Sequence, residues 1–198
     1  MGWDQLQPDE NDFNGGTLAR SVADYNYAKS HGFPYCWNST LYRQSNLPSW
    51  FPGLSPSAAL RARENLLAGI ASNVPNIDQI EVFNEPIHEG GNVPANIYNA
   101  LGGAGTTGWD WLILAFRIVR SHFPNASLGV NEWRTELTGN SIHSSYVSLL
   151  QTLKNAGVLQ WYGLENCWGS IYPNNPLSTS AAPAPKPTPA RPHRHHRS

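Results

Sequence analysis

Strand-like and helical segments alternate along most of this chain, and this alternation constrains the fold more than any other sequence feature. Helical patterns begin at Thr17, Ser55, Trp109 and Ser144, and strand-like runs occupy residues 34–37, 80–84, 127–133 and 159–166. The run 80–84 (IEVFN) is almost continuously apolar, as expected where both faces of a strand are covered. Alternating strands and helices favour βα units. The sequence therefore predicts an α/β fold with a parallel sheet.

Local signals mark several helix ends. Ser55 and Pro56 have the residue types of an N-cap and a first helical position, and Gly32 and Gly157 stand where two helical patterns stop. The most apolar helical run, residues 109–119 (WDWLILAFRIV), is too short to cross a membrane. It is predicted to be a core helix, and no membrane partner is expected.

The charge distribution argues against nucleic acid as a partner. All 14 Asp and Glu residues precede Leu177, whereas four of the 13 Lys and Arg residues follow it, so the body of the chain is acidic. An acidic body with eight tryptophans does not suggest phosphate binding. Aromatic faces of this kind suit packing against the apolar faces of sugar rings.

Cysteine usage points to neither a metal nor a cofactor. Cys36 and Cys167 lie far apart in the sequence, in no metal-ligand spacing, so a zinc site is not expected. The two cysteines are consistent with one disulfide or with two free thiols.

One short motif carries chemistry. Asn84 ends the apolar run 80–84, and Glu85 and Pro86 follow it directly, at the boundary between a rigid strand and a loop. Glycosidic cleavage needs a protonated carboxylic acid beside a polar group that holds the sugar. Glu85 is therefore the candidate acid and Asn84 its polar neighbour, whereas Glu89, in the following HEGG loop, is expected to face solvent. A plain strand-terminating turn is the competing interpretation.

Five segments in order resemble glycoside hydrolase family 10, the endo-β-1,4-xylanases, over about residues 1–169. They are MGWDQLQP at 1–8, STLYRQSNLPSW at 39–50, EVFNEPI at 81–87, LAFRIVRSHFPNASLGVNEWRTE at 114–136 and GVLQWYGLENCW at 157–168. The resemblance implies a (β/α)8 TIM barrel with its site at the carboxyl ends of the strands. It also implies that Glu85 is the general acid/base.

The resemblance implies further sugar-binding positions at Asn84, Asn46, Trp50, Asn131, Trp133 and Glu165. Several of these depart from the family's pattern: Asn46 replaces Gln but keeps an amide, Glu132 and Trp133 replace Asp and Tyr, and Glu165 replaces Gln. On the donor side, Gly2, Ser39, Arg43 and Gln44 replace the family's Lys, His, Trp and His, and Cys167 replaces the His that supports the nucleophile. Donor-side recognition is therefore expected to differ from that of a typical xylanase.

By the same resemblance the barrel is expected to be incomplete. Strands two to six are expected within residues 1–172, while the first strand and strands seven and eight, including the nucleophilic Glu, are expected to be missing. The motif TEL at 135–137 is similar to the nucleophile segment, but it follows the fifth strand and is interpreted as coincidence. Residues 173–198, rich in Pro and Ala and ending in His and Arg, are predicted to be a disordered tail or linker. The start lacks a signal peptide, and we expect that a secretion signal was lost upstream.

The sequence thus predicts a retaining endo-β-1,4-glycanase, xylanase-like, secreted, monomeric and acting on plant cell-wall polysaccharide, in a truncated form that is inactive by itself. Two alternatives remain open. One is another clan-A β-glucanase, because N-E-P after a fourth strand is shared across that clan. The other is a non-catalytic carbohydrate-binding remnant that uses Trp50 and Trp133 as platforms.

Overall fold

The structure, a computed structural model, describes residues 18–41, 46–133, 135 and 141–165. The chain divides into two compact units, Met1–Asn166 and Cys167–Ser198, and every described residue belongs to the first. The predicted second-strand segment at the start of the chain and the predicted tail therefore lie outside the described residues. The domain boundary at residue 172 stays a prediction.

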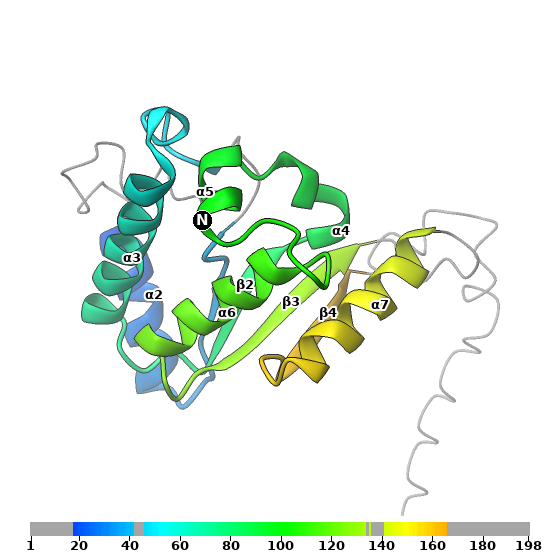
Figure 1. The fold of residues 1–198 in the computed structure, drawn as a ribbon. Helices are drawn as coiled ribbons and strands as arrows, with labels where there is room; N and C mark the ends of the chain where they lie inside the picture. The colour runs from blue at the N-terminus through cyan, green and yellow to red at the C-terminus, as the bar shows by residue number, and fades with distance from the viewer. Residues whose placement is uncertain (1–17, 42–45, 134, 136–140, 166–198) are drawn as a thin grey trace, which may run out of the picture. The chain divides into compact units, whose positions relative to one another are not determined.

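A four-stranded parallel sheet forms the centre of the described part (Figure 1). Its strands are β1 (Cys36–Asn38), β2 (Gln79–Asn84), β3 (Ser127–Trp133) and β4 (Trp161–Glu165), paired in chain order. This confirms the predicted parallel sheet. Sequential parallel order is the order of neighbouring strands in a (β/α)8 barrel, so the sheet corresponds to part of such a barrel.

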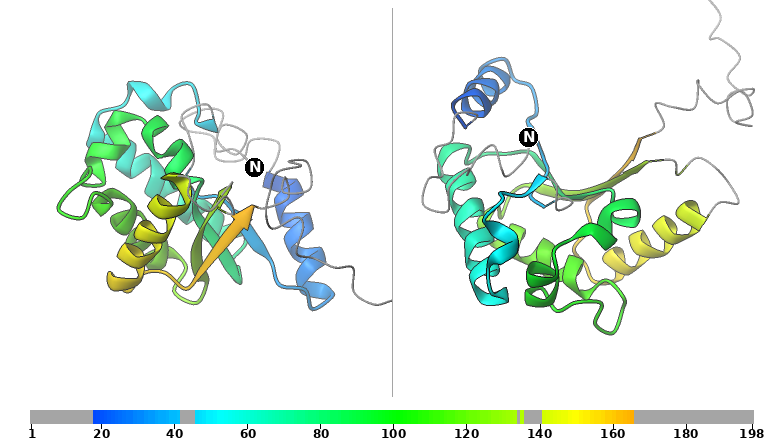
Figure 2. Two further views of the ribbon diagram at one scale, coloured as in Figure 1. Left: turned by 90° about the vertical axis from the view of Figure 1, so that its right-hand side faces the viewer. Right: turned by 90° about the horizontal axis from the view of Figure 1, so that it is seen from above.

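Helices connect the strands and gather on one face of the sheet. The main ones are α2 (Leu18–Ser30), α3 (Pro56–Asn73), α6 (Asp110–His122) and α7 (Ser141–Asn155). Figures 1 and 2 show α3, α6 and α7 side by side on the same face, whereas Figure 2 shows α2 apart from these three helices, beyond β1. The Ser55 Oγ accepts a hydrogen bond from the Ala58 amide at 3.3 Å, and Pro56 opens α3, as predicted. None of the described helices is both long and apolar enough to span a membrane.

The core lies between the sheet and this helical layer. Ile80, Val82, Phe83 and Val130 from the sheet are fully buried, as are residues of α3 and α6. The apolar run at 109–119 contributes Trp111, Leu112, Ala115, Phe116 and Val119 to this core, so its prediction as a core helix is confirmed. The Tyr146 hydroxyl of α7 lies 3.1 and 3.0 Å from the carbonyl oxygens of Val130 and Gly163, so it bridges β3 and β4.

Short helices fill the long connection between β2 and α6. They are α4 (Pro86–Glu89), the 3-10 helix η3 (Gly90–Asn92) and α5 (Ala95–Ala100), with a further 3-10 helix η2 (Phe51–Gly53) before α3. The sequence analysis did not predict them, because helices of one turn are too short to show a 3.6-residue period. The first predicted strand also shifts, from 34–37 to Cys36–Asn38: the Tyr35 amide donates instead to the Asp78 carboxylate at 2.7 Å.

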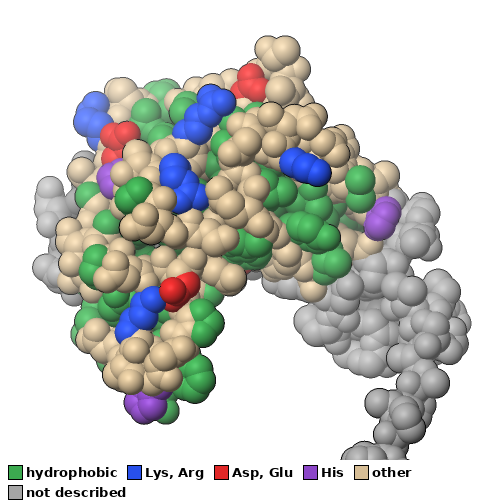
Figure 3. All heavy atoms as spheres, turned by 90° about the horizontal axis from the view of Figure 1, so that it is seen from below, with side chains coloured by type: hydrophobic (Ala, Val, Ile, Leu, Met, Phe, Trp, Pro, Cys, Tyr) green, Lys and Arg blue, Asp and Glu red, His purple; other side chains and the backbone are tan. Residues whose placement is uncertain are grey.

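On the face seen in Figure 3, Lys and Arg side chains stand apart from one another, and hydrophobic side chains gather between them. Nucleic-acid phosphates are bound by clustered cations. The described residues of this face form no such cluster.

Candidate active site

Glu85 follows the last residue of β2 and has an unusual backbone conformation. Its φ and ψ are 56° and 57°, in the left-handed region, which costs an L-residue about 1–2 kcal/mol. Its amide donates to the Asn131 carbonyl at 2.8 Å, and its own carbonyl accepts from the Glu89 amide at 2.7 Å. These bonds hold the turn between β2 and α4. Strained backbone of this kind is typical of functional positions.

Asn84 and Asn131 form a short amide relay beside the Glu85 carboxylate. They stand opposite each other in the register of β2 and β3, and both are buried. The Asn131 Nδ2 donates to the Asn84 Oδ1 at 3.4 Å, and the Asn84 Nδ2 donates to the Glu85 Oε1 at 3.1 Å. The structure therefore brings together three of the residues that the sequence analysis predicted for the site.

Gly163 makes room for this relay, and the sequence analysis missed it. It pairs with Asn131 in the register of β3 and β4, and a Cβ at this position would lie 2.5 Å from the Asn131 Oδ1. A side chain here would displace the amide. A glycine inside a strand often marks such a close approach, so residue 163 carried a readable signal.

The Glu132 side chain faces the side of the sheet opposite to Asn131, because successive side chains of a strand face opposite sides of the sheet. It is fully buried. Its Oε2 accepts from the Ile87 amide at 2.7 Å, and its Oε1 lies 2.6 Å from the His88 Nδ1 and accepts from the Trp133 amide at 3.0 Å. The carboxylate thus fastens the first turn of α4, immediately after Glu85. Although it lies near a strand end, it is not placed to act as a substitute nucleophile.

Trp133 ends β3 and is half-buried. Its ring packs against the His88 ring, with centroids 4.6 Å apart and planes inclined by 36°. His88, which the sequence analysis did not predict, therefore supports both the aromatic ring and the buried carboxylate. The sequence analysis predicts that the Trp133 ring stacks on a sugar, and that role stays a prediction.

The other predicted residues approach from the two edges of the sheet. Asn46 and Trp50 lie on the connection between β1 and α3, which Asn96 ties to α5 by donating to the Phe51 carbonyl at 2.9 Å. Glu165 ends β4 and pairs with Trp133 in the strand register, but its side chain lies outside the described residues. Glu89 is half-buried and accepts a hydrogen bond from the Asn92 Nδ2 at 2.9 Å. Among the described residues, no three His, Cys, Asp or Glu side chains gather as a metal site would require.

Comparison with known proteins places the sequence in a family. The sequence profile of glycosyl hydrolase family 10 matches residues 1–172. Endo-1,4-beta-xylanase C and endo-1,4-beta-xylanase A of Phanerodontia chrysosporium are 28% and 27% identical to the chain over 164 residues. Those matches cover 80% of this chain but only 38% and 37% of the two relatives.

Solved structures show the same fold. A xylanase 10B from Thermotoga petrophila, in complex with xylobiose, has a TM-score of 0.66 at 19% identity, covering 82% of this chain and 48% of its own. A mutant xylanase 10C from Cellvibrio japonicus, in complex with xylopentaose, has a TM-score of 0.65 at 16% identity, covering 83% and 33%. At these identities the likeness establishes the fold. The described sheet is thus an incomplete part of a (β/α)8 barrel, and Glu85 stands at the carboxyl edge of its strands.

Proposed function

Because the chain belongs to glycosyl hydrolase family 10, we propose that Glu85 is the general acid/base of a retaining endo-β-1,4-glycanase acting on xylan-like polysaccharide. One observation carries the proposal: a carboxylic acid on a left-handed backbone at the carboxyl end of β2, with the Asn84 amide on its Oε1. Active sites of TIM-barrel enzymes lie at this edge. The family match also favours this function over that of the other clan-A β-glucanases.

The proposed roles follow from the chemistry of the groups. Glu85 protonates the leaving glycosidic oxygen and later takes a proton from water. Asn84, whose amide oxygen accepts from Asn131, is oriented with its NH₂ group toward the acid and the sugar. Trp133 offers a stacking surface. Asn46, Trp50, Asn131 and Glu165 complete the proposed substrate contacts.

A retaining mechanism also needs a nucleophilic carboxylate about 5–5.5 Å from the acid. Glu132 is buried and holds α4. Glu81 lies on β2, four positions before Glu85, which follows that strand; at about 3.3 Å per strand residue this places it roughly 10 Å or more away. We therefore propose that this chain supplies the acid and sugar contacts but no nucleophile, and that by itself it does not hydrolyse the glycan.

The chain spans less than half the length of the curated relatives it matches. The activity of a whole enzyme, its secretion, its monomeric state and its polysaccharide substrate are accordingly parts of this proposal. Two of the solved structures hold xylobiose or xylopentaose, which supports a xylo-oligosaccharide as the ligand to try first.

The proposed inactivity is tested with the purified chain. Xylan, β-glucan and an aryl β-xylobioside are incubated with wild type and with Glu85→Ala, and reducing ends and released aglycone are measured. We expect no release above the Glu85→Ala control. Release by wild type would refute the proposed inactivity, and loss of that release in Glu165→Gln would identify Glu165 as a stand-in nucleophile. Binding of xylotriose without turnover would support a carbohydrate-binding role.

The role of Glu85 is tested in a form extended to a whole barrel. General acid catalysis contributes about 10²–10⁴-fold where the leaving group is poor. Glu85→Gln should therefore remove most activity on xylan, while activity on an activated aryl glycoside falls far less. Equal losses on the two substrates would remove Glu85 from the acid role.

A further inference from the structure

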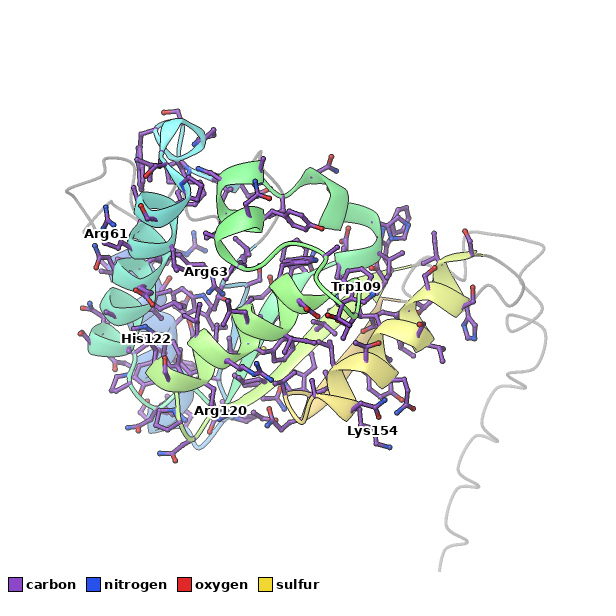
Figure 4. The ribbon with its side chains drawn as sticks, in the orientation of Figure 1. Arg61, Arg63, Trp109, Arg120, His122 and Lys154 are labelled. Atoms are coloured by element: carbon purple, nitrogen blue, oxygen red, sulfur yellow. The ribbon has the colours of Figure 1, made fainter. Side chains whose placement is uncertain are left out.

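A pocket of about 380 Å³ lies behind the helix that follows Glu85, between α4, η3, α5 and the start of α6. Pockets that bind small molecules usually have volumes of about 300–1,000 Å³. Its walls include Ile87, Gly90, Gly91, Tyr98, Trp109 and Trp111. Figure 4 shows Trp109 at the beginning of α6, beside the α4 segment. None of Asn84, Asn131 and Trp133 lines this pocket, so it is distinct from the proposed catalytic site.

Aromatic rings form the rear of the pocket. The Trp111 ring centroid is 6.2 Å from that of Trp109 and 5.9 Å from that of Tyr98. A Cβ at Gly90 would lie 3.7 Å from the Trp111 ring and 3.9 Å from the Trp109 ring. Gly90 therefore leaves space beside the two rings that a side chain would fill. Trp111 is itself buried, so the half-buried Trp109 is the ring that a ligand in the pocket can reach.

The lining sets the chemistry of the ligand. None of the residues that line the pocket is charged. An anionic ligand such as a phosphate would find no cation, whereas a neutral ring with one apolar face and several hydroxyl groups fits aromatic walls. Tyr98 and Trp109 bring a hydroxyl and an indole N–H to the lining, and both kinds of group form hydrogen bonds with sugar hydroxyls.

The loop that carries Trp109 is held in place before any ligand arrives. The Asp110 carboxylate accepts hydrogen bonds from the Thr106 amide at 2.9 Å and from the Thr107 amide at 3.2 Å. The Trp109 amide donates to the Thr107 Oγ1 at 3.1 Å. A preformed wall lowers the ordering cost of binding.

We propose that this pocket binds one pyranose ring of a neutral β-linked glycan, as a second sugar site outside the catalytic cleft. The identity of the ligand class rests on the proposed function; the location rests on the pocket itself. A polysaccharide chain held behind α4 would remain anchored beside the Glu85 edge of the sheet.

A variant that fills the pocket with a side chain tests whether the sugar binds there. Gly90 has an ordinary right-handed backbone, with φ −57° and ψ −33°, so Gly90→Leu places a side chain over the tryptophans without backbone strain. Gly53→Leu is the matched control: it makes the same change in η2, where a Cβ would meet nothing within 4 Å. Xylotriose and cellotriose are titrated by calorimetry into wild type, Gly90→Leu, Gly53→Leu, Trp109→Ala and Trp133→Ala, after circular dichroism has compared their folding.

We expect Gly90→Leu and Trp109→Ala to weaken one binding component about tenfold or more, as loss of an aromatic anchor usually does. Gly53→Leu and Trp133→Ala should retain that component. Equal affinity in Gly90→Leu and wild type would overturn the proposal.

A measurement on the wild-type protein tests the same site without relying on variants, which could misfold. Tryptophan oxidation by N-bromosuccinimide, mapped by mass spectrometry, should slow at Trp109 when xylotriose is present. Protection of Trp133 but not Trp109 would overturn the second site and leave the proposed function intact. Protection of Trp109 together with failure of the tests on Glu85 would support the second site alone.

Discussion

At the scale of single residues, Glu132 shows how a charged side chain can serve a site without touching the substrate. It is fully buried, and its two oxygens meet the Ile87 amide, the His88 ring and the Trp133 amide. These contacts hold α4, which directly follows Glu85, against the end of β3. We infer that Glu132 is a positioning residue for the proposed acid.

Glu132→Gln should destabilise the protein. The amide NH₂ replaces one acceptor oxygen and faces donors, leaving buried polar groups unsatisfied at a cost of about 1–3 kcal/mol. For a chain of this size each kcal/mol lowers Tm by about 2–4 °C. Thermal unfolding by circular dichroism measures the change, with Glu64→Gln on the exposed side of α3 as control. An unchanged Tm in Glu132→Gln would contradict the positioning role.

At the scale of elements, Asp78, which lies just before β2, forms hydrogen bonds with three other parts of the chain: α2, the residue before β1 and the start of β3. Its carboxylate accepts hydrogen bonds from the Lys29 ammonium of α2 at 2.6 Å and from the Tyr35 amide before β1 at 2.7 Å. Its carbonyl accepts from the Ser127 amide at the start of β3 at 2.8 Å. The hydrogen bonds from Lys29 and Tyr35 hold the pKa of Asp78 below its usual range.

The stabilisation by Asp78 should depend on pH. A depressed carboxyl pKa stabilises the folded state above the unfolded pKa of about 3.9, and this contribution is lost as pH falls through the lower folded pKa. Because the ion pair is partly exposed, it contributes no more than about 1 kcal/mol to the free energy of unfolding. Urea unfolding should therefore separate Asp78→Asn from wild type at pH 7 and bring them together in acid. Asp24→Asn, exposed on α2, is the control, and a difference independent of pH would argue against this role.

Arg63 is a buried cation in the helical layer. It is fully buried on α3, and Figure 4 shows it pointing toward α5 and α6. Within the described residues none of its three guanidinium nitrogens has a hydrogen-bond partner, and burial lowers its pKa to about 10. The nearby His122 also has a lowered pKa, mainly because it is partly buried. The Glu64 charge raises the pKa of His122, and the Arg63 charge lowers it.

Arg63→Met should stabilise the protein, since an apolar side chain of similar length removes an unpaired buried charge. Replacing buried ionic groups by packed apolar ones gains about 1–4 kcal/mol in favourable cases. The pKa of His122, followed by NMR, should rise in the same variant. Arg61→Met, on the exposed side of α3, should change neither quantity. A lower Tm for Arg63→Met than for wild type would show that the buried guanidinium makes interactions that stabilise the folded protein.

At the scale of the whole molecule, the described sheet has two edge strands, β1 and β4. β4 is the last strand in the order, and Tyr162 and Leu164 on it are 56% and 49% exposed. Exposed apolar edges favour association and loose packing. The helical layer buries a continuous core against the sheet, so secondary structure should persist.

We therefore predict that the chain by itself is marginally stable, with weak near-UV circular dichroism and binding of a hydrophobic dye. Tyr162→Ser together with Leu164→Ser should reduce the dye signal, because the two side chains contribute to the exposed apolar surface. A sharp cooperative transition above about 45–65 °C, the usual mesophile range, would contradict the prediction.

Local patterns in the sequence were sufficient for much of the architecture. The strand at 127–133 and the start of α3 at Pro56 appear where their patterns predict them, because period and capping chemistry act within a few residues. The end of β2 at Asn84 likewise appears where the NEP motif predicts it, since a strand end followed by proline is a local signal, whereas the catalytic role of Glu85 stays a prediction.

Tertiary structure alone decided which strand-end side chains meet. A β-bulge between Glu81 and Phe83 shifts the register of β2 against β3, so that Asn84 stands opposite Asn131. Without it Asn84 would stand opposite Glu132, on the other side of the sheet. The left-handed turn at Glu85 depends on the same pairing, and the opening left by Gly163 depends on the register of β3 with β4. Register is set by contacts between strands far apart in the chain, and a shift of one residue exchanges the two faces, so no local pattern could fix it.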